Sequence, residues 1–114
     1  EKVFLSPALP SGTHRLHFLR NGLYLGDLKK DRFEPSQPFA MTLSADTFTD
    51  CLDLDPDDDR IRRYLAGEPI PVADGETASA TGWKLVCVQG FSLGWGKLVN
   101  GTLKNKYPAG WRRN

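Results

Sequence analysis

Long hydrophobic runs, cysteines and histidines are all scarce in this chain of 114 residues. No apolar stretch approaches the roughly 18 residues that a membrane-spanning helix needs, so we expect no membrane partner. The two cysteines, Cys51 and Cys87, are too few for a disulfide framework and too isolated for a zinc site. Cys87 stands in an apolar run, where a cysteine is usually a small buried hydrophobe. Unpaired thiols fit a reducing compartment, and we expect a cytoplasmic location.

Motifs that carry catalysis are also missing from the sequence. Its only histidines, His14 and His17, have no carboxylate partner at an obvious spacing. A phosphate-binding loop and a nucleophile elbow are both absent. Gly94-Trp95-Gly96 resembles the start of a dinucleotide-binding motif, but it follows a turn and does not open a helix. We therefore predict no catalytic residue, no bound cofactor and no metal ion in this chain.

The size and composition that remain are those of an ordinary folded domain. A chain of this length has room for one core, and 39% hydrophobic with 25% charged residues lies in the globular range. The first residue is Glu1, with neither an initiator methionine nor a signal peptide before it. We expect the chain to be a piece of a longer protein.

Acidic residues are absent after Glu76, although the net charge of the whole chain is only +1. Seven aspartates fall between Asp46 and Asp59, whereas the last third carries cations alone. Those cations are Lys84, Lys97, Lys104, Lys106, Arg112 and Arg113. Such a basic third indicates a polyanionic partner, and a merely solvated basic face is the alternative that charge leaves open.

The first fifty residues predict short strands and one helix. Residues 3–5 and 15–19 read as strands, and Asn21-Gly22 is a strong hairpin signal that leads into a returning strand over residues 23–28. Residues 29–32 are a charged tip or an exposed strand end. Ser36 can cap a helix that starts near Gln37 and Pro38 and turns Phe39, Ala40 and Leu43 inward.

The aspartate-rich stretch predicts the start of a second helix over residues 57–66. Asp55 is a suitable N-cap, Pro56 fits the first helical position, and the following acids complement the positive end of the helix dipole. Gly67 ends the helix. An apolar face at helical spacing consists of Ile61, Tyr64 and Leu65. A calcium loop would need a glycine and a terminal glutamate that this stretch lacks.

The last third predicts three consecutive antiparallel strands. Residues 83–88 form an apolar strand covered on both faces, and residues 93–99 return along it. Asn100-Gly101 turns the chain into a strand over residues 102–107, which Pro108 ends. Gly94 and Gly96 indicate curvature or close backbone approach, as a small barrel requires. The fold class we predict is α+β, mostly β: a small antiparallel barrel with flanking short helices.

Cations and aromatics alternate at the end of the chain. Lys97, Lys104, Lys106, Arg112 and Arg113 are interleaved with Trp95, Tyr107 and Trp111. Cations neutralise phosphates and aromatic rings stack on unpaired bases, so this mixture suits RNA. The hairpin at Asn100-Gly101 places Lys97 opposite Lys104, and we expect the five cations to form one patch. For Trp95 and Trp111 a place in the core is the favoured alternative.

Several motifs in order resemble one known family. Leu93-Gly94-Trp95-Gly96-Lys97 and Leu103-Lys104-Asn105-Lys106-Tyr107-Pro108 lie in a segment, residues 82–112, that resembles the C-terminal PUA-like RNA-binding domain of RsmF-type rRNA cytosine-C5 methyltransferases of the Sun/Fmu family. Residues 20–26 and 32–36 resemble the region that follows the catalytic domain in that family, and residues 63–68 resemble its helix before the barrel. The likeness covers nearly the whole chain.

The resemblance implies two regions and a parent enzyme. Residues 1–50 would be an intermediate region that follows a methyltransferase domain, and residues 51–114 a PUA-like RNA-binding domain. The parent enzyme would transfer a methyl group from S-adenosylmethionine to C5 of a cytidine, using cysteines in motifs that neither Cys51 nor Cys87 matches. The chain itself would be non-catalytic and would hold ribosomal RNA for that enzyme.

The resemblance and the charge pattern together give a set of candidate RNA-binding residues: Lys97, Lys104, Asn105, Lys106, Tyr107, Arg112 and Arg113. The expected partners are ribosomal RNA and the catalytic domain of the same protein, with the chain itself a monomer. The alternative function is a protein-interaction module that docks on the catalytic domain or on a ribosomal protein, which the acidic helix start and the apolar richness favour.

Overall fold

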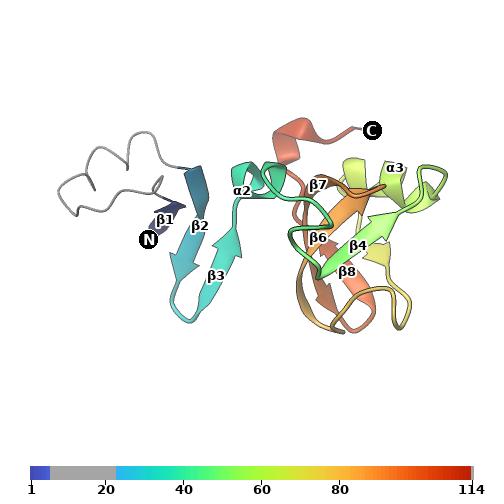
Figure 1. Ribbon diagram of the computed structural model, residues 1–114, viewed down its shortest axis with the longest axis horizontal. Coiled ribbons are helices and arrows are strands. Elements are labelled where there is room, and N and C mark those ends of the chain that lie inside the picture. Colours follow the sequence, from blue (N-terminus) through green and yellow to red (C-terminus); the bar gives the residue numbers. More distant parts are fainter. Residues whose placement is uncertain (6–22, 114) are drawn as a thin grey trace. The chain divides into compact units, whose positions relative to one another are not determined.

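The computed structural model describes residues 1–5 and 23–113, and the chain divides into two compact units, residues 1–39 and 40–114. Figure 1 shows the elements along the chain. They are β1 (Lys2–Leu5), β2 (Leu23–Lys29), β3 (Arg32–Pro35), α2 (Gln37–Met41), β4 (Cys51–Leu54), α3 (Asp59–Leu65), β5 (Ile70–Pro71), β6 (Gly82–Val88), β7 (Phe91–Val99), β8 (Thr102–Asn105) and the 3-10 turn η2 (Ala109–Trp111). Within the described ranges no helix is both long and apolar enough to cross a membrane.

The first unit contains a three-stranded antiparallel sheet in the order β1-β2-β3. The strands predicted over residues 3–5 and 23–28 are confirmed, and the charged tip is the turn between β2 and β3, which the Lys29–Arg32 pair closes. Strand β3 was not predicted, because it has only four residues and ends at Pro35, a residue that is depleted in strands. The strand expected over residues 15–19 and the turn at Asn21-Gly22 lie outside the described residues.

Helix α2 starts where the sequence predicts. The Oγ atom of Ser36 accepts a hydrogen bond from the backbone N–H of Phe39 at 3.2 Å and donates one to the carbonyl oxygen of Tyr24. Ser36 thus caps the helix and ties it to β2. Ala40 is fully buried, whereas Leu43, which we expected on the same helix, lies beyond its last residue, Met41.

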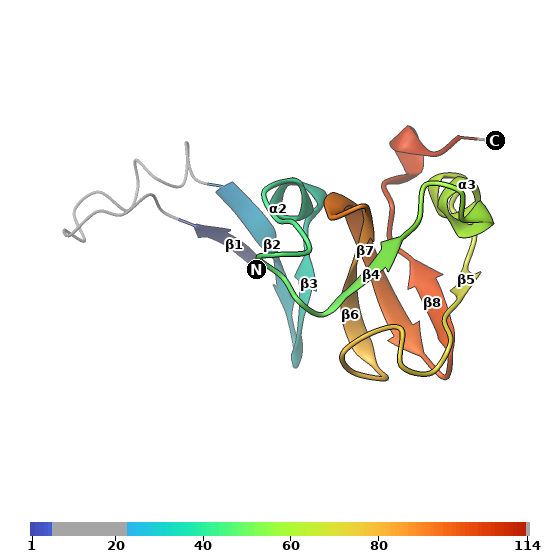
Figure 2. The ribbon, with the colours of Figure 1, turned by 45° about the vertical axis from the view of Figure 1, so that its right-hand side comes forward.

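The second unit contains a five-stranded sheet in the order β4-β6-β7-β8-β5, which curls into a half-barrel (Figure 2). Strands β6, β7 and β8 run antiparallel to their neighbours in the series, as predicted. The pairing of β4 with β6 is parallel, so the sheet is mixed and not antiparallel throughout. A parallel pair needs a long crossover, and residues 55–81 supply it. Strand β4 was not predicted, because it lies within the aspartate-rich part of the sequence, where the charged residues hide the strand pattern.

The core of this unit lies on one face of the curled sheet. It gathers Leu52, Leu54, Tyr64, Ile70, Val72, Val86, Leu98 and Leu103. Four consecutive residues of β6, from Lys84 to Cys87, are buried, so that strand is covered on both faces as predicted. A Cβ atom added at Gly96 would lie 2.5 Å from the Leu103 side chain. The close approach predicted at Gly96 is therefore confirmed, since only glycine leaves room for Leu103.

Helix α3 begins two residues later than predicted and has a different cap. The Oδ1 atom of Asp58, and not the side chain of Asp55, accepts the hydrogen bond from the backbone N–H of Arg60, at 2.9 Å. The carbonyl oxygen of Asp55 instead accepts a hydrogen bond from the backbone N–H of Asp58, in a turn that precedes the helix. Several aspartates in a row offer alternative caps, and sequence alone does not choose among them. Gly67 ends the helix with φ of +90° and donates to Tyr64, as predicted.

The second hairpin is confirmed, but its last strand is shorter than expected. Asn100 and Gly101 have positive φ values of 50° and 79°, as a two-residue turn requires. Strand β8 ends at Asn105 and not next to Pro108. The backbone N–H of Lys106 still donates to the carbonyl oxygen of Trp95 at 3.2 Å, but that of Tyr107 donates to the Asn105 side chain at 2.8 Å, a local bond that turns the chain away from the ladder.

Candidate nucleic-acid interface

A row of side chains crosses three strands on the face of the sheet opposite the core. Trp83 of β6 pairs with Lys97 of β7, and Lys97 pairs with Lys104 of β8. Directly opposed residues of antiparallel strands share a face, and their neighbours Leu98 and Leu103 point into the core. The predicted placement of Lys97 opposite Lys104 is confirmed.

Lys106 joins this row through the ring of Trp83. The Nζ atoms of Lys97 and Lys106 lie 5.7 Å and 5.9 Å from the centroid of that ring, within the range of a cation–π contact. The four residues Trp83, Lys97, Lys104 and Lys106 are here named the lysine face. Across residues 23–113, no carboxylate comes within ion-pair distance of any of the three lysines. Their charge is therefore open to an anion from outside.

Trp95 lies on the same face of the sheet as Lys97, two residues before it on β7, and is buried there, as the favoured alternative predicts. It is 2% exposed and packs edge-on against Trp83 at 6.4 Å and against Phe48 at 5.2 Å. Trp83 itself was missed as a site residue. Its place beside Lys97 depends on the register of β6 and β7, which shifts at a bulge near Val86, and residue spacing does not reveal such a shift.

Two of the candidate residues, Asn105 and Tyr107, are engaged in the fold. The Nδ2 atom of Asn105 donates to the carbonyl oxygens of Tyr64 at 2.8 Å and Glu68 at 2.9 Å, which ties β8 to the end of α3. The ring of Tyr107 packs against Tyr64 at 5.3 Å. These contacts hold the C-terminal segment in place, so both residues position their neighbours.

The terminal arginines form a second basic group next to the end of α3. The Nε atom of Arg112 donates to the carbonyl oxygen of Tyr107 at 3.1 Å. The backbone N–H of Arg113 donates to the carbonyl oxygen of Leu65 at 2.7 Å. Both side chains are exposed. The structure places Lys97 and Lys106 at the ring of Trp83, Lys104 opposite Lys97, and the two arginines beside the end of α3. That all five cations form one patch stays a prediction.

Lys84 does not belong to the basic surface, although sequence placed it among the cations of the last third. Its side chain is fully buried, and Nζ donates at 2.7 Å to Asp50, to the Oγ of Ser79 and to the carbonyl oxygen of Thr81. Burial raises the pKa of Asp50, but hydrogen bonds from Lys84 and Ser79 outweigh it and lower the pKa overall. A lysine inside an apolar run was the available signal of this structural role.

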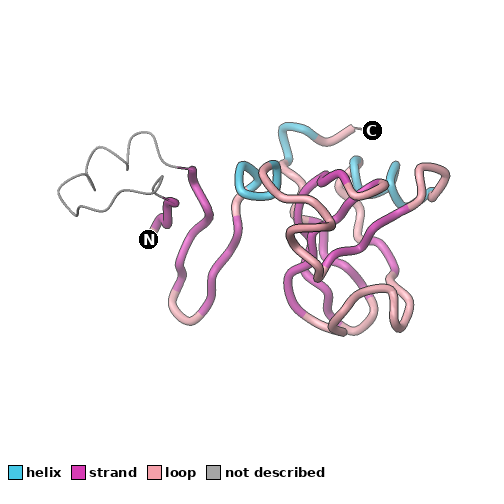
Figure 3. The backbone as a smooth tube through the Cα atoms, in the orientation of Figure 1, coloured by secondary structure: helices cyan, strands magenta, loops and turns pink. Residues whose placement is uncertain are grey.

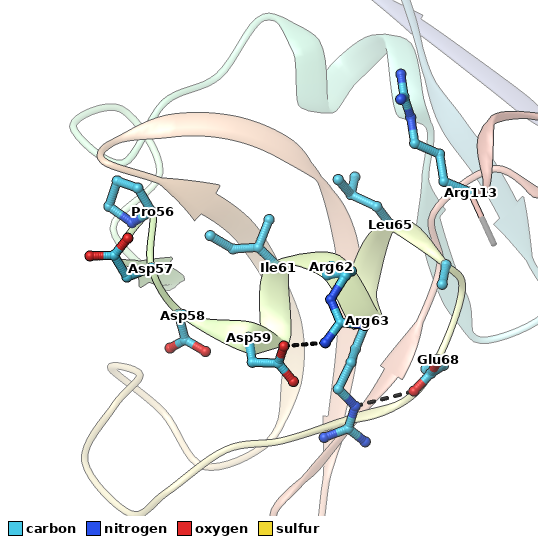
Figure 4. Close-up of a pocket in the computed structure, with 11 residues that line it drawn as sticks. Pro56, Asp57, Asp58, Asp59, Ile61, Arg62, Arg63, Leu65, Glu68 and Arg113 are labelled. Carbon is cyan, nitrogen blue, oxygen red and sulfur yellow. Dashed lines mark hydrogen bonds and ion pairs between the residues drawn. The ribbon is translucent and has the colours of Figure 1, made fainter.

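A groove of about 730 Å³ lies along α3, and its charges are of both signs (Figure 4). Its acids are Asp57, Asp58, Asp59 and Glu68, and its cations are Arg62, Arg63 and Arg113. Figure 4 shows the ion pairs of Arg62 with Asp59 and of Arg63 with Glu68. A groove of mixed charge lacks the uniform positive potential that an RNA backbone needs. The lysine face is the better candidate.

The two thiols are poor nucleophiles in this fold. Burial raises the pKa of Cys87 to about 12, and burial also raises the pKa of Cys51. Both therefore stay protonated at neutral pH, whereas a nucleophilic cysteine acts as the thiolate. The prediction that Cys87 is a buried hydrophobe is confirmed. In the part of the chain that the structure describes, no three His, Cys, Asp or Glu side chains gather as metal ligands.

Comparison with protein families gave two matches in chain order. The model described as the RsmF rRNA methyltransferase first C-terminal domain matches residues 1–43, and the model described as the methyltransferase RsmF PUA domain matches residues 51–113. The second match covers more than half of the chain and contains every residue of the lysine face. A comparison with curated proteins returned no match.

Proposed function

This chain belongs to the RsmF family of rRNA methyltransferases, whose PUA domain it carries, and we propose that it anchors ribosomal RNA for methyl transfer at a separate catalytic domain. We assign the RNA-binding role to residues 51–114. The chemistry, transfer from S-adenosylmethionine to C5 of a cytidine, would be left to that catalytic domain. Figure 3 shows how much of the proposed anchor is strand, from β4 to β8.

The lysine face is the observation that carries this proposal. Two lysines without acidic partners lie over the ring of Trp83, a third, Lys104, lies opposite Lys97 on the next strand, and such an array of ammonium groups suits phosphate oxygens. Contacts to phosphates hold an RNA in place without reading its sequence. Such anchoring supplies proximity, because a bound RNA presents its target base to the catalytic domain at high effective concentration.

Substitution of two lysines tests the proposal. In Lys104→Ala/Lys106→Ala we expect weaker binding to many ribosomal RNA fragments about equally, because phosphate contacts are independent of sequence. The slope of log affinity against log salt should flatten by roughly one unit per lost contact. Fluorescence anisotropy at several salt concentrations measures both quantities.

The double variant Arg62→Ala/Arg63→Ala is the matched control. It removes the same charge from the same unit, but both arginines already pair with nearby acids, Arg62 with Asp59 and Arg63 with Glu68. Its salt slope should stay close to that of the parent chain. If the lysine variant keeps the parent's affinity and slope, RNA is anchored elsewhere and the proposal is wrong.

A protein-docking function is the second candidate, and the exposure of Phe91 favours it. This ring, at the turn between β6 and β7, is 77% exposed, which is unusual for a large apolar side chain. The acidic helix start, by contrast, no longer favours docking, since Arg60 and Arg62 engage its acids. Phe91→Ala should weaken association with a separately produced RsmF-type catalytic domain and leave RNA binding unchanged.

A further inference from the structure

Trp111 differs sharply in exposure from Trp95, although sequence suggested the same core role for both. Trp95 is 2% exposed, and Trp111 is 52% exposed near the C-terminal end. Leaving half of an indole in water is unfavourable for a residue whose only role is packing. The core placement suggested for Trp111 is wrong, and the exposed ring calls for another role.

The exposed ring is held on a rigid support. Tyr64 is fully buried, Tyr107 packs against it at 5.3 Å, and Trp111 meets Tyr107 edge-on at 6.0 Å with an interplanar angle of 78°. The turn η2 fixes the backbone, because the N–H of Trp111 donates to the carbonyl oxygen of Pro108 at 3.0 Å. A row of three rings thus leads from the core to the surface, and little conformational entropy remains to be lost on binding.

Two exposed guanidinium groups follow Trp111 directly in the chain. The stem of Arg112 lies against Gly67, where an added Cβ atom would come within 2.5 Å of Cδ, and Arg113 is fixed through its backbone bond to Leu65. Glu68, the nearest acid in sequence to this end of α3, already pairs with Arg63 at 3.1 Å. The surroundings of the exposed ring are therefore cationic.

We propose that Trp111 is a stacking platform for an unpaired nucleobase, and that Arg112 and Arg113 bind the phosphates beside that base. The proposal rests on the RNA-binding function proposed above and deepens it, because it names single-stranded RNA as the ligand. A base within a duplex is stacked on both faces and cannot cover the indole, whereas an unpaired base can.

The contrast with Phe91 supports a base over a protein side chain as the occupant. Phe91 is the other strongly exposed aromatic of this unit, and the charged group beside it is an acid, because the Oδ1 atom of Asp53 accepts a hydrogen bond from the backbone N–H of Gly90 at 2.8 Å. A carboxylate there repels a phosphate, whereas a protein partner can tolerate it. Trp111 instead combines a ring of large π surface with two adjacent cations, the pair of groups that one nucleotide requires.

Paired binding measurements on two RNAs test the proposal. One is a single-stranded ribosomal RNA fragment, and the other is a blunt duplex of equal length. Stacking on one base contributes about 1–3 kcal/mol, so Trp111→Ala should weaken binding to the single strand about tenfold or more and alter duplex binding less than twofold. Trp111→Phe should recover most of the affinity, because a benzene ring also stacks. Phe91→Ala is the control and should bind both RNAs like the parent chain.

Tryptophan fluorescence gives a second, independent measure. Binding of the single strand should quench the tryptophan emission of the parent chain. The share of this quenching that is due to Trp111 should be lost in Trp111→Phe. A thermal unfolding curve verifies that this variant is folded. Equal losses on both RNAs, or no loss on either, would overturn the stacking proposal and leave Trp111 to a protein partner. Failure of the parent chain to bind any RNA would instead overturn the proposed function itself, so the two failures are distinguishable.

Discussion

At the scale of single residues, the structure gives two lysines different roles, one in the core and one on the surface. Lys84 and Lys97 both lie in the barrel strands, yet Lys84 is fully buried against Asp50 whereas Lys97 faces the ring of Trp83. A buried ammonium group must have partners, because an unpaired charge in the interior is very unfavourable. Lys84 therefore serves folding, and it pins the loop before β6 to the strand through Ser79 and Thr81.

Loss of the partner of Lys84 should destabilise the fold. Asp50→Ala leaves a buried lysine with only neutral acceptors, and we expect the free energy of unfolding to fall by about 3 kcal/mol. Lys84→Met keeps the buried volume and leaves Asp50, which is 31% exposed, partly in water. Its loss should be smaller, under about 1.5 kcal/mol. Urea denaturation measures both, and equal losses would contradict the structural role of the pair.

At the scale of elements, sequence patterns located strands better than they located pairings. The alternation and the two-residue turn at Asn100-Gly101 were enough to predict β6, β7 and β8, because those signals are local. The parallel partner β4 was missed, since its contact with β6 depends on a crossover of more than twenty residues. The α3 cap was misplaced by three residues, because Asp55 and Asp58 are equally good caps in isolation.

The same limit applies to the candidate site. Lys97 and Lys104 were placed together correctly, because a hairpin fixes their register. The roles of Trp83 and Asn105 could not be predicted from the sequence. The role of Trp83 depends on a bulged register, and that of Asn105 on a helix end that lies 37 to 41 residues away in sequence. Long-range contacts of this kind follow from tertiary packing and not from local residue type.

The charge cluster around Arg60 predicts how stability depends on pH. Hydrogen bonds from Arg60 hold the pKa values of Asp58 and Glu76 below their usual range. Because these pKa values are lower in the folded chain than in the unfolded one, the stabilisation is complete above about pH 5. It is lost as the pH falls through the folded values. We expect the urea midpoint to decline steadily between about pH 5 and pH 2.

Glu76→Gln should flatten that decline and lower the free energy of unfolding by about 1 kcal/mol at pH 7, a modest figure because Glu76 is 31% exposed. Asp57→Asn removes a carboxylate from the same region that is not among the partners of Arg60, and it should preserve the parent's pH profile. If both variants follow the parent profile, Arg60 does not govern the acid response.

At the scale of the whole molecule, the acids and the unpaired lysines of the second unit lie in different parts of the sequence. The acids of the second unit lie before residue 77, and three of those around α3, Asp58, Asp59 and Glu68, pair with arginines of that helix. The lysine face has no such partners among the described residues, so its field extends into solvent. An anion approaching the barrel should be drawn to the outer face of β6, β7 and β8.

The most direct test of RNA anchoring at that face is a nuclear magnetic resonance titration of the chain with a ribosomal RNA fragment at low salt. The largest signal changes should fall on the indole N–H of Trp83 and on the amides of Lys97, Lys104 and Lys106, and they should diminish as salt is added. Trp95, which is buried, should change little. Changes confined to α3 and its groove, with the lysine face silent, would contradict the proposed anchor.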